Sequence, residues 1–479
     1  MQTSAAETAS AIYTDVTREN IQPLFSDIAK QISLAEFVAV DTEFTGLGLS
    51  NASPVFRFDT ADWLTRATDM RDMYKGMANV AKTHALVSMG LSTFVRTSDG
   101  MFHVYSFNFI LQEQSTHLVS PASIAFLAQN GFDLGKQALQ GIRYFSGPNP
   151  HPVESRSEDI NLEGDLLRKV LFALVRAKKP LVIHNGLFDL VYIYQSFFGP
   201  LPDSHESFVF DLHTLFPAGI YDTKLIAESL DPGTASFLAY LYHKSERIHR
   251  QRREQAIEAL SIKQTKILVR EKSGAESDRN PQPRRRPQNT RGGKTPETRP
   301  SKPYCEHFAA FGHCKFRDQC RHSHDLEFIL DCQQEEAEAP ADQDAAIEAP
   351  PVQNGKRKRN DEGSLPPSKI LKALGKNMSQ LKTESSVLPA ENSGSAAAYH
   401  TAAYDAYMTG FIFASLRLVH GDAVEEHKNK VFRMGRGVEP LLIQASIYAS
   451  ASTTYRQTIK LIEEMEFPGE TAKSEPPAN

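Results

Sequence analysis

The chain has 479 residues, of which 41% are hydrophobic and 23% are charged. A chain of this length is long enough for two or three domains. The formal net charge of −5 does not by itself indicate a nucleic-acid partner. No stretch approaches the about 18 consecutive apolar residues of a membrane span, and the N-terminus lacks a basic segment followed by an apolar run. We therefore expect a soluble intracellular protein without a membrane partner.

The first half of the chain alternates between strand and helix patterns, from about Ile21 to Tyr242. Four short apolar segments predict strands: Phe37–Val40, His84–Leu91, Phe102–Phe109 and Leu181–Ile183. A helix is expected from about Leu187 to the Gly199-Pro200 stop. This mixture predicts an α/β domain built around a mixed sheet.

Beyond Tyr242 the pattern changes several times. A charged helical segment to about Lys272 precedes a Pro/Arg-rich linker, a cysteine cluster and an acidic tract, and helical spacing returns at Tyr404. Val431-Phe432 and the stretch from Leu441 to Tyr448 predict terminal elements. The expected segments are an N-terminal tail (1–20), a first domain part (21–245), a charged helix with basic linker (246–300), a finger (301–328), a disordered linker (329–395), a second domain part (396–465) and a C-terminal tail (466–479).

The sequence Val40-Asp41-Thr42-Glu43-Phe44 carries the strongest chemical signal. Alternate residues of a strand point to the same face, so Asp41 and Glu43 project together, about 6–7 Å apart along the chain. Two carboxylates at the end of an apolar strand are costly unless they are paired or bind a metal. Oxygen ligands of this kind suit Mg²⁺.

Two further acidic positions follow. Asp189 falls in the first turn of the helix after the strand Leu181–Ile183, where stabilisation of the helix dipole is an equally good explanation. His400 and Asp405 are five residues apart, so on one helix they would point to different faces. They converge only if His400 lies on the loop before the helix that carries Asp405.

In this order, Asp-x-Glu, Asp and His-x₄-Asp resemble the histidine-bearing branch of the DEDD exonuclease superfamily, and within it the poly(A)-specific ribonuclease and Caf-type deadenylases. The segments that carry the resemblance are Phe44–Leu47, Ser123–Leu127, Gly131–Asp133, Asp222–Lys224 and Tyr404–Gly410. The resemblance covers about Ile21–Tyr242 and Tyr399–Ala449.

The resemblance implies a ribonuclease H-like fold, split by the insertion that carries the cysteines. Asp41, Glu43, Asp189 and Asp405 would hold two Mg²⁺ ions, and His400 would be the general base. Phe44 would stack on the terminal nucleotide. Asp222 is the alternative third acid, although the matching acid of the family looks structural.

The implied reaction is 3′-to-5′ hydrolysis that removes 3′ adenosine tails from RNA and releases 5′-AMP. Family resemblance also suggests small nuclear and other non-coding RNA precursors, in the nucleus, the nucleolus or Cajal bodies. A DNA-directed 3′-to-5′ exonuclease and a non-catalytic zinc-finger regulator remain as alternatives.

All four cysteines lie between residues 305 and 332. Clustered thiols favour a metal site over disulfides. Cys305-x₈-Cys314-x₅-Cys320-x₃-His324 has the spacing of a CCCH zinc finger, in which one structural Zn²⁺ would replace a missing apolar core. Cys332 lies outside the pattern. Three other histidines are alternative ligands that break the spacing: His307, His313 and His322.

Aromatic and basic residues alternate along the finger. Phe308, Phe311 and Phe316, together with Tyr304, interleave with lysines and arginines, which suits stacking on single-stranded RNA. The alternative is that two of the aromatics form the finger's own small core. Two basic runs, Lys356–Arg359 and Arg284–Arg286, are typical of binding to a nuclear import receptor or to RNA phosphates; a merely solvated charge run is the alternative.

Overall fold

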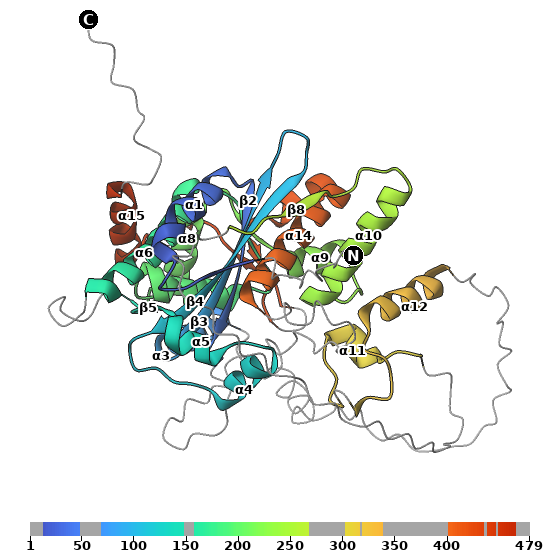
Figure 1. The fold of residues 1–479 in the computed structure, drawn as a ribbon, viewed down its shortest axis with the longest axis horizontal. Helices are drawn as coiled ribbons and strands as arrows, with labels where there is room; N and C mark the ends of the chain where they lie inside the picture. Colours follow the sequence, from blue (N-terminus) through green and yellow to red (C-terminus); the bar gives the residue numbers. More distant parts are fainter. Residues whose placement is uncertain are drawn as a thin grey trace, which may run out of the picture.

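The computed structural model describes residues 13–47, 69–147, 158–267, 302–316, 319–338, 401–434, 438–446 and 449–465. These residues form a twisted sheet with helices on both faces and the cysteine-bearing insert at one side (Figure 1). None of the described helices combines the length and apolar character needed to cross a membrane.

Ten strands within the described residues form one sheet. Along its main path they are β1 (Thr14–Val16), β4 (Phe102–Glu113), β3 (Leu86–Arg96), β2 (Phe37–Phe44), β6 (Leu181–Ile183), β7 (Ile220–Asp222), β9 (Lys430–Val431) and β10 (Leu441–Leu442). The short strands β5 (Ile142–Tyr144) and β8 (Ile262–Gln264) pair with β4.

The five central strands follow the order β4-β3-β2-β6-β7. Of these, only β3 runs antiparallel to its neighbours, while β2, β6 and β7 are mutually parallel. This is the ribonuclease H-like arrangement that the resemblance implied. Because β2, β6 and β7 are parallel, their carboxyl ends meet at one edge of the sheet.

Helices cover the two faces of the sheet and define two apolar clusters. One face carries α1 (Ile21–Leu34), α3 (Met70–Thr83), α6 (Glu158–Ala177), α7 (Leu187–Ile193), which continues as a π-helical turn (Tyr194–Phe198), and α8 (His205–Leu215). The other face carries α9 (Thr223–Leu230), α10 (Leu238–Glu254) and α14 (Ala402–His420), followed by a 3₁₀ segment (Gly421–His427). Three outer helices complete the domain: α4 (Pro121–Gln129), α5 (Leu134–Gln140) and α15 (Thr453–Glu464).

The side chains of strand β2 alternate between the two faces of the sheet. Val38 and Val40 belong to the cluster beneath α1 and α7, whereas Phe37 and Ala39 belong to the cluster beneath α14. The period of two along a strand therefore aims Asp41 and Glu43 at the α14 face and Thr42 at the other face.

The insert contains α11 (Glu306–Phe311) and α12 (Leu326–Glu338), and described helices extend across two of the expected boundaries around it. The first domain part does not end at 245, because α10 packs on α14 and β8 adds to the sheet beside β4. The charged helix itself stops at Glu254. The finger does not end at 328, because α12 continues its chain and packs against α10. The other expected linkers and tails lie mostly outside the described residues, at 1–12, 268–300, 339–400 and 466–479.

Candidate active site and metal centres

Helix α14 approaches the sheet closely enough to bring its first turn beside β2. Gly90 on β3 is the cross-strand partner of Asp41. A Cβ atom at Gly90 would lie 1.9 Å from the backbone oxygen of Ala402, the first residue of α14. Further along the helix, a Cβ at Gly410 would lie 2.1 Å from the ring of Phe94. Two glycines thus allow the helix backbone to lie directly on the strands.

This close packing places Asp405 next to the two acids of β2. One carboxylate oxygen from each of Asp41, Glu43 and Asp405 lies within 4.8 Å of the other two. Asp405 is 5% exposed and the other two are partly buried. Three carboxylates at this distance repel one another strongly unless a cation lies among them. An all-oxygen donor set suits Mg²⁺, so these residues fit the magnesium site that the resemblance implied.

Asp189 lies beside this cluster but on the other side of β2. Its Oδ1 accepts hydrogen bonds from the Thr42 backbone N–H (3.0 Å) and from Thr42 Oγ1 (2.5 Å). The pairing of β2 with β6 reaches only to Ala39, so Asp189 satisfies a strand N–H that β6 leaves unpaired. Asp189 does not belong to the three-carboxylate group, and its role as a fourth ligand stays a prediction.

Asp222, the alternative third acid, is fully buried and holds loops together. Its Oδ1 accepts from the backbone N–H groups of Asn185 (2.9 Å) and Lys224 (3.1 Å), and its Oδ2 accepts from that of Phe432 (3.1 Å). Burial raises the pKa of Asp222 to about 6. Its carboxylate caps α9 and joins three segments, and it lies outside the three-carboxylate group.

His400 lies outside the described residues. Helix α14 begins at Ala402, and the side chain of Thr401 caps it by accepting from the Tyr404 N–H. The role of His400 as the base stays a prediction.

Comparison with known proteins identifies the family. The profile of the CAF1 family ribonucleases matches residues 16–165 and 153–413, which together include all three clustered carboxylates. The chain belongs to the CAF1 ribonuclease family. Among curated CAF1-type relatives, it is 44% identical over 57 residues to poly(A)-specific ribonuclease PNLDC1 of Homo sapiens, covering 12% of this chain and 11% of that protein.

Other similarities are longer and weaker. The chain is 28% identical over 156 residues to poly(A)-specific ribonuclease PARN of Xenopus laevis, covering 30% of this chain and 23% of that protein. It is 28% identical over 214 residues to the probable CCR4-associated factor 1 homolog 5 of Arabidopsis thaliana, covering 44% and 65%. Pop2p of S. pombe, solved in a Mg²⁺- and Mn²⁺-bound form, matches with 19% identity and a TM-score of 0.35, covering 49% of this chain and 82% of Pop2p. The matched stretches thus span only about a tenth to a quarter of PNLDC1 and PARN.

In this CAF1-family domain Phe44 is a core residue. It is 4% exposed, and its ring stacks on Tyr192 at 4.5 Å with an interplanar angle of 9°. A second ring, that of Phe188, lies 6.4 Å away. Packing accounts for the position of Phe44, and stacking on the terminal nucleotide stays a prediction.

The second candidate metal centre is in the insert. Ligand atoms of Cys305, Cys314, Cys320 and His324 all lie within 4.8 Å of one another. Three thiols and one imidazole at this separation fit a tetrahedral Zn²⁺ site, as the spacing predicted. Cys305 also caps α11, because its Sγ accepts from the Phe308 N–H at 3.5 Å. Cys332 and the three alternative histidines are not members of this group.

The aromatic residues of the finger divide between two sides. Tyr304 and Phe308 are buried, at 3% and 2% exposure, and the Phe308 ring stacks on His324 at 4.4 Å. The ring of Phe308 also lies 6.1 Å from that of Phe237, so packing accounts for its position, and RNA binding by Phe308 stays a prediction. Phe311 and Phe316 are 42% and 56% exposed, so they remain available for stacking.

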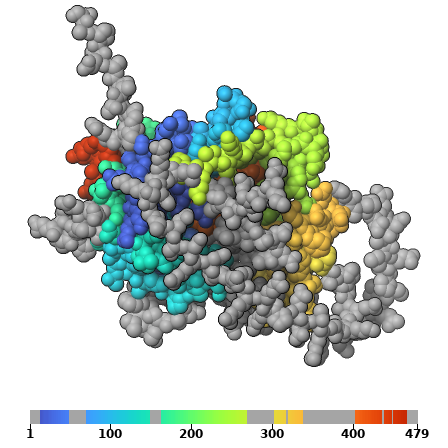
Figure 2. Space-filling view, viewed as in Figure 1, coloured from blue at the N-terminus to red at the C-terminus, as the bar shows by residue number. Residues whose placement is uncertain are grey.

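The buried side of the finger packs on the nuclease domain. Tyr304, Phe308 and Leu330 share one apolar cluster with Phe237 and Tyr240 of α10 and the segment before it. Around this cluster α12 is joined to α10 by charged contacts, since Arg247 contacts both Glu327 (3.2 Å) and Asp331. Figure 2 shows the insert and α10 in one continuous surface. The sequence pattern contained no signal for this docking, because it indicated only stacking on RNA or a small core within the finger as roles for these aromatic residues.

Proposed function

We propose that this chain is a 3′-to-5′ exoribonuclease that removes 3′ adenosine tails from RNA and releases 5′-AMP. The observation that carries the proposal is the convergence of Asp41, Glu43 and Asp405 from β2 and α14 at the carboxyl edge of a ribonuclease H-like sheet. Repulsion among three clustered carboxylates lowers the stability of the fold, and a protein that only binds RNA would gain nothing in return. The presence of the cluster therefore favours catalysis over a purely regulatory role.

The residues have distinct roles in this proposal. Asp41, Glu43 and Asp405, joined by Asp189, would hold two Mg²⁺ ions, which when bound supply Lewis-acid stabilisation of the attacking and leaving oxygens. His400 would accept the proton of the attacking water, since imidazole is a common general base at neutral pH. Thr42 fixes the Asp189 carboxylate against β2.

The nature of the substrate is proposed from resemblance. The relatives named poly(A)-specific ribonuclease support an adenosine-rich 3′ end. The zinc finger inserted before the last motif makes the chain similar to the nuclear deadenylase called target of EGR. We extend the proposal to non-coding RNA precursors, to action in the nucleus, the nucleolus or Cajal bodies, and to import through the basic runs.

The deciding experiment compares degradation of 5′-labelled oligo(A), oligo(U) and oligo(dA) with added Mg²⁺, using Asp41→Asn as the inactive control. We expect single-nucleotide shortening of oligo(A) from its 3′ end, slower shortening of oligo(U) and little of oligo(dA). Preference for oligo(dA) would support the DNA exonuclease instead. Binding without degradation of any of the three would support the regulator.

A further inference from the structure

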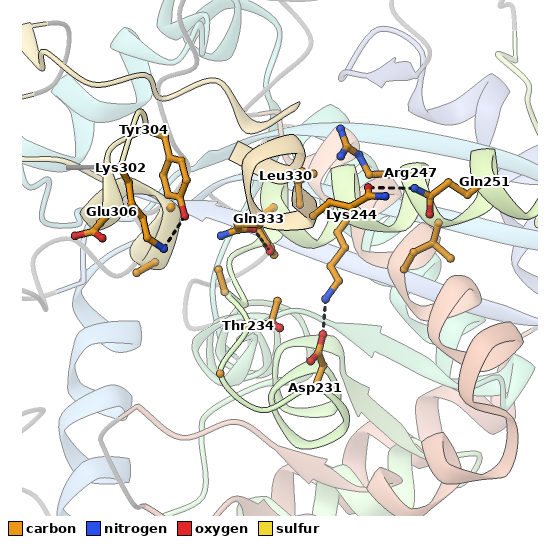
Figure 3. A pocket seen from close by; sticks show the side chains of 17 residues that line it. Asp231, Thr234, Lys244, Arg247, Gln251, Lys302, Tyr304, Glu306, Leu330 and Gln333 are labelled. Carbon is orange, nitrogen blue, oxygen red and sulfur yellow. Dashed lines mark hydrogen bonds and ion pairs between the residues drawn. The ribbon is translucent and has the colours of Figure 1, made fainter. Parts of the chain in front are cut away.

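A cavity of about 640 Å³ lies between the finger and α10 (Figure 3). Its walls come from four segments: the loop after α9, helix α10, helix α12 and the start of the finger. This volume is within the about 300–1,000 Å³ that is usual for ligand sites. None of the predicted catalytic or zinc-binding residues lines it.

Cationic side chains from two of these segments surround the cavity. Lys244 and Arg247 come from α10, and Lys302 comes from the start of the finger. Lys244 pairs with Asp231, whose side chain is 51% exposed, and Lys302 pairs with Glu336 (2.9 Å), whose side chain is 46% exposed. Ion pairs this exposed contribute little to stability, so an incoming anion can compete for both lysines.

Arg247 provides a more specific indication. Its side chain is 15% exposed, and its terminal nitrogen Nη2 contacts Glu327 and Asp331 of α12. Its Nε is buried and has no hydrogen-bond acceptor among the residues that the structure describes. A buried guanidinium N–H without an acceptor is costly, so a movement of the Arg247 side chain toward a ligand oxygen in the cavity would remove that cost.

The remaining polar walls suit nucleobases. The amide groups of Gln251, Gln333 and Gln334 line the cavity, and amides can both donate to and accept from base edges. Gln333 already accepts from the hydroxyl of Tyr240 at 2.8 Å, which holds its oxygen and leaves its NH₂ group to donate.

The cavity is one loop away from the catalytic edge of the sheet. The loop residues Gly233, Thr234 and Ala235 line it. The next residue, Ser236, accepts a hydrogen bond from Lys224 Nζ at 2.8 Å. Lys224 lies in the first turn of α9, directly after β7 ends at the same edge as the carboxylates. RNA that leaves the active site over this loop would reach the cavity.

We propose that this cavity binds the single-stranded RNA that lies 5′ of the nucleotide being removed, with phosphates near Lys244, Arg247 and Lys302 and a base against the amide wall. The inference rests on the proposed function and adds a second contact region on the same substrate. Acidic α12 side chains lie nearby, so we expect a site that adds affinity for long RNA rather than one that binds tightly alone.

The test measures RNA binding to the full chain in an Asp41→Asn background, which keeps the RNA intact. Lys244→Glu with Lys302→Glu, and each of the two as a single variant, are compared with Lys75→Glu, a single charge reversal at a side chain that is 69% exposed on α3. Fluorescence anisotropy gives the Kd of a long and a short labelled oligo(A) over a range of salt concentrations. Thermal midpoints identify variants that do not fold, and Gln251→Ala then provides a milder change in the same wall.

We expect the double reversal to weaken binding of long oligo(A) near 0.1 M salt by about fivefold for each phosphate that the variant no longer neutralises, and to make the salt slope shallower by about 0.7 per phosphate. Short oligo(A) and the Lys75→Glu variant should bind as the parent does. Equal Kd values and slopes for long oligo(A) in all folded variants would overturn the cavity proposal. The proposed function is judged separately, by whether the unmodified chain shortens oligo(A).

Discussion

The chain builds its two candidate metal centres in opposite ways. The candidate zinc ligands Cys305, Cys314, Cys320 and His324 come from one short segment, whereas the carboxylates Asp41, Glu43 and Asp405 come from opposite ends of the chain. In both centres the ligand atoms lie within 4.8 Å of one another. The first arrangement needs little more than local turns and a metal ion, while the second needs the whole sheet and helix α14 to be folded first.

The difference determines what each centre depends on. The entropic cost of closing a loop grows only slowly with the length of the loop. A long insert between β8 and α14 is therefore compatible with a stable domain when α14 is well packed. Helix α14 is almost entirely buried from Ala402 to Ser415. The finger also gains from tertiary structure, since its inner face joins the apolar cluster of α10.

Loss of a clustered carboxylate should have the largest effect. Asp405→Asn and Glu43→Gln should reduce degradation of oligo(A) to background, because each removes a charged oxygen ligand. The thermal midpoint without metal should stay the same or rise, since repulsion within the cluster falls. Gel assays of labelled oligo(A) and thermal melts provide the two measurements. Retained turnover in both variants would remove the acid cluster from the mechanism.

Asp189→Asn sharpens this prediction. An asparagine Oδ1 can still accept from Thr42, so the strand contact is kept while the charge is removed. If Asp189 is a metal ligand, as we propose, activity falls as it does for Asp405→Asn. Near-normal activity would assign Asp189 to the strand alone.

Gly90→Ala tests whether the acid cluster depends on close packing. The added Cβ would meet the Ala402 backbone at 1.9 Å, so the start of α14 must shift. We expect about 1–3 kcal/mol of destabilisation and a fall in kcat on short oligo(A) of about 10²-fold. Gly164→Ala is the control, because its nearest backbone neighbour would be an ordinary 3.4 Å away. Equal kcat in the two variants would contradict the packing argument.

Cys314→Ser tests the local centre. The finger should lose its zinc, and the thermal midpoint should fall because Tyr304 and Phe308 no longer hold their places beside α10. KM for long RNA should rise several-fold more than KM for short oligo(A). Zinc content, melting and steady-state kinetics measure these effects. Cys332→Ser, outside the ligand group, should change none of them; an equal loss of zinc there would indicate a different ligand set.

The exposed aromatics of the finger should have a smaller effect. Phe311→Ala with Phe316→Ala should weaken binding of long oligo(A) by about 1–3 kcal/mol for each base that no longer stacks. The thermal midpoint should not change, because both rings are exposed. Phe328→Ala, on α12 and 39% exposed, is the matched control. Identical affinities in the two variants would mean that the outer face of the finger does not stack on bases.

The smallest effect at neutral pH is expected from His249, which joins α10 to α14. Its Nδ1 accepts a hydrogen bond from the Leu260 N–H (3.2 Å). In the neutral ring the hydrogen is therefore on Nε2, which donates it to Ser415 Oγ (2.8 Å). Burial lowers the pKa of His249 to about 4. The unfolded chain therefore binds more protons between about pH 6.5 and 4, and stability falls as the pH falls through this window, by at most roughly 3 kcal/mol from this group. Urea unfolding of His249→Gln should show a shallower fall over the same window, and an unchanged slope would contradict the assignment.

The sequence predicted the elements whose signals are local. The strand Leu181–Ile183 has the expected ends, and β2 places Asp41 and Glu43 on one face as the strand period requires. The helix that carries Asp405 starts just after position 400. Strand β3 runs further than expected, to Arg96, because its pairing with β4 continues there. Strand β4 runs further than expected, to Glu113, because its last three residues pair with β5.

Spacing along the chain thus predicted the cysteine and histidine group and the pairing of Asp41 with Glu43, because short intervals between ligands and alternation on a strand are properties of the sequence itself. Asp405 was added to the acids by the family resemblance. Three features were decided only by the tertiary structure. Gly90 allows α14 to pack directly on the sheet, and Asp189 accepts a hydrogen bond from Thr42. Phe308 is buried, whereas Phe311 is exposed. These outcomes depend on which distant surfaces pack together. A local sequence pattern does not show which distant surface will pack against it. Whether a side chain is buried is therefore decided only when the two surfaces pack together.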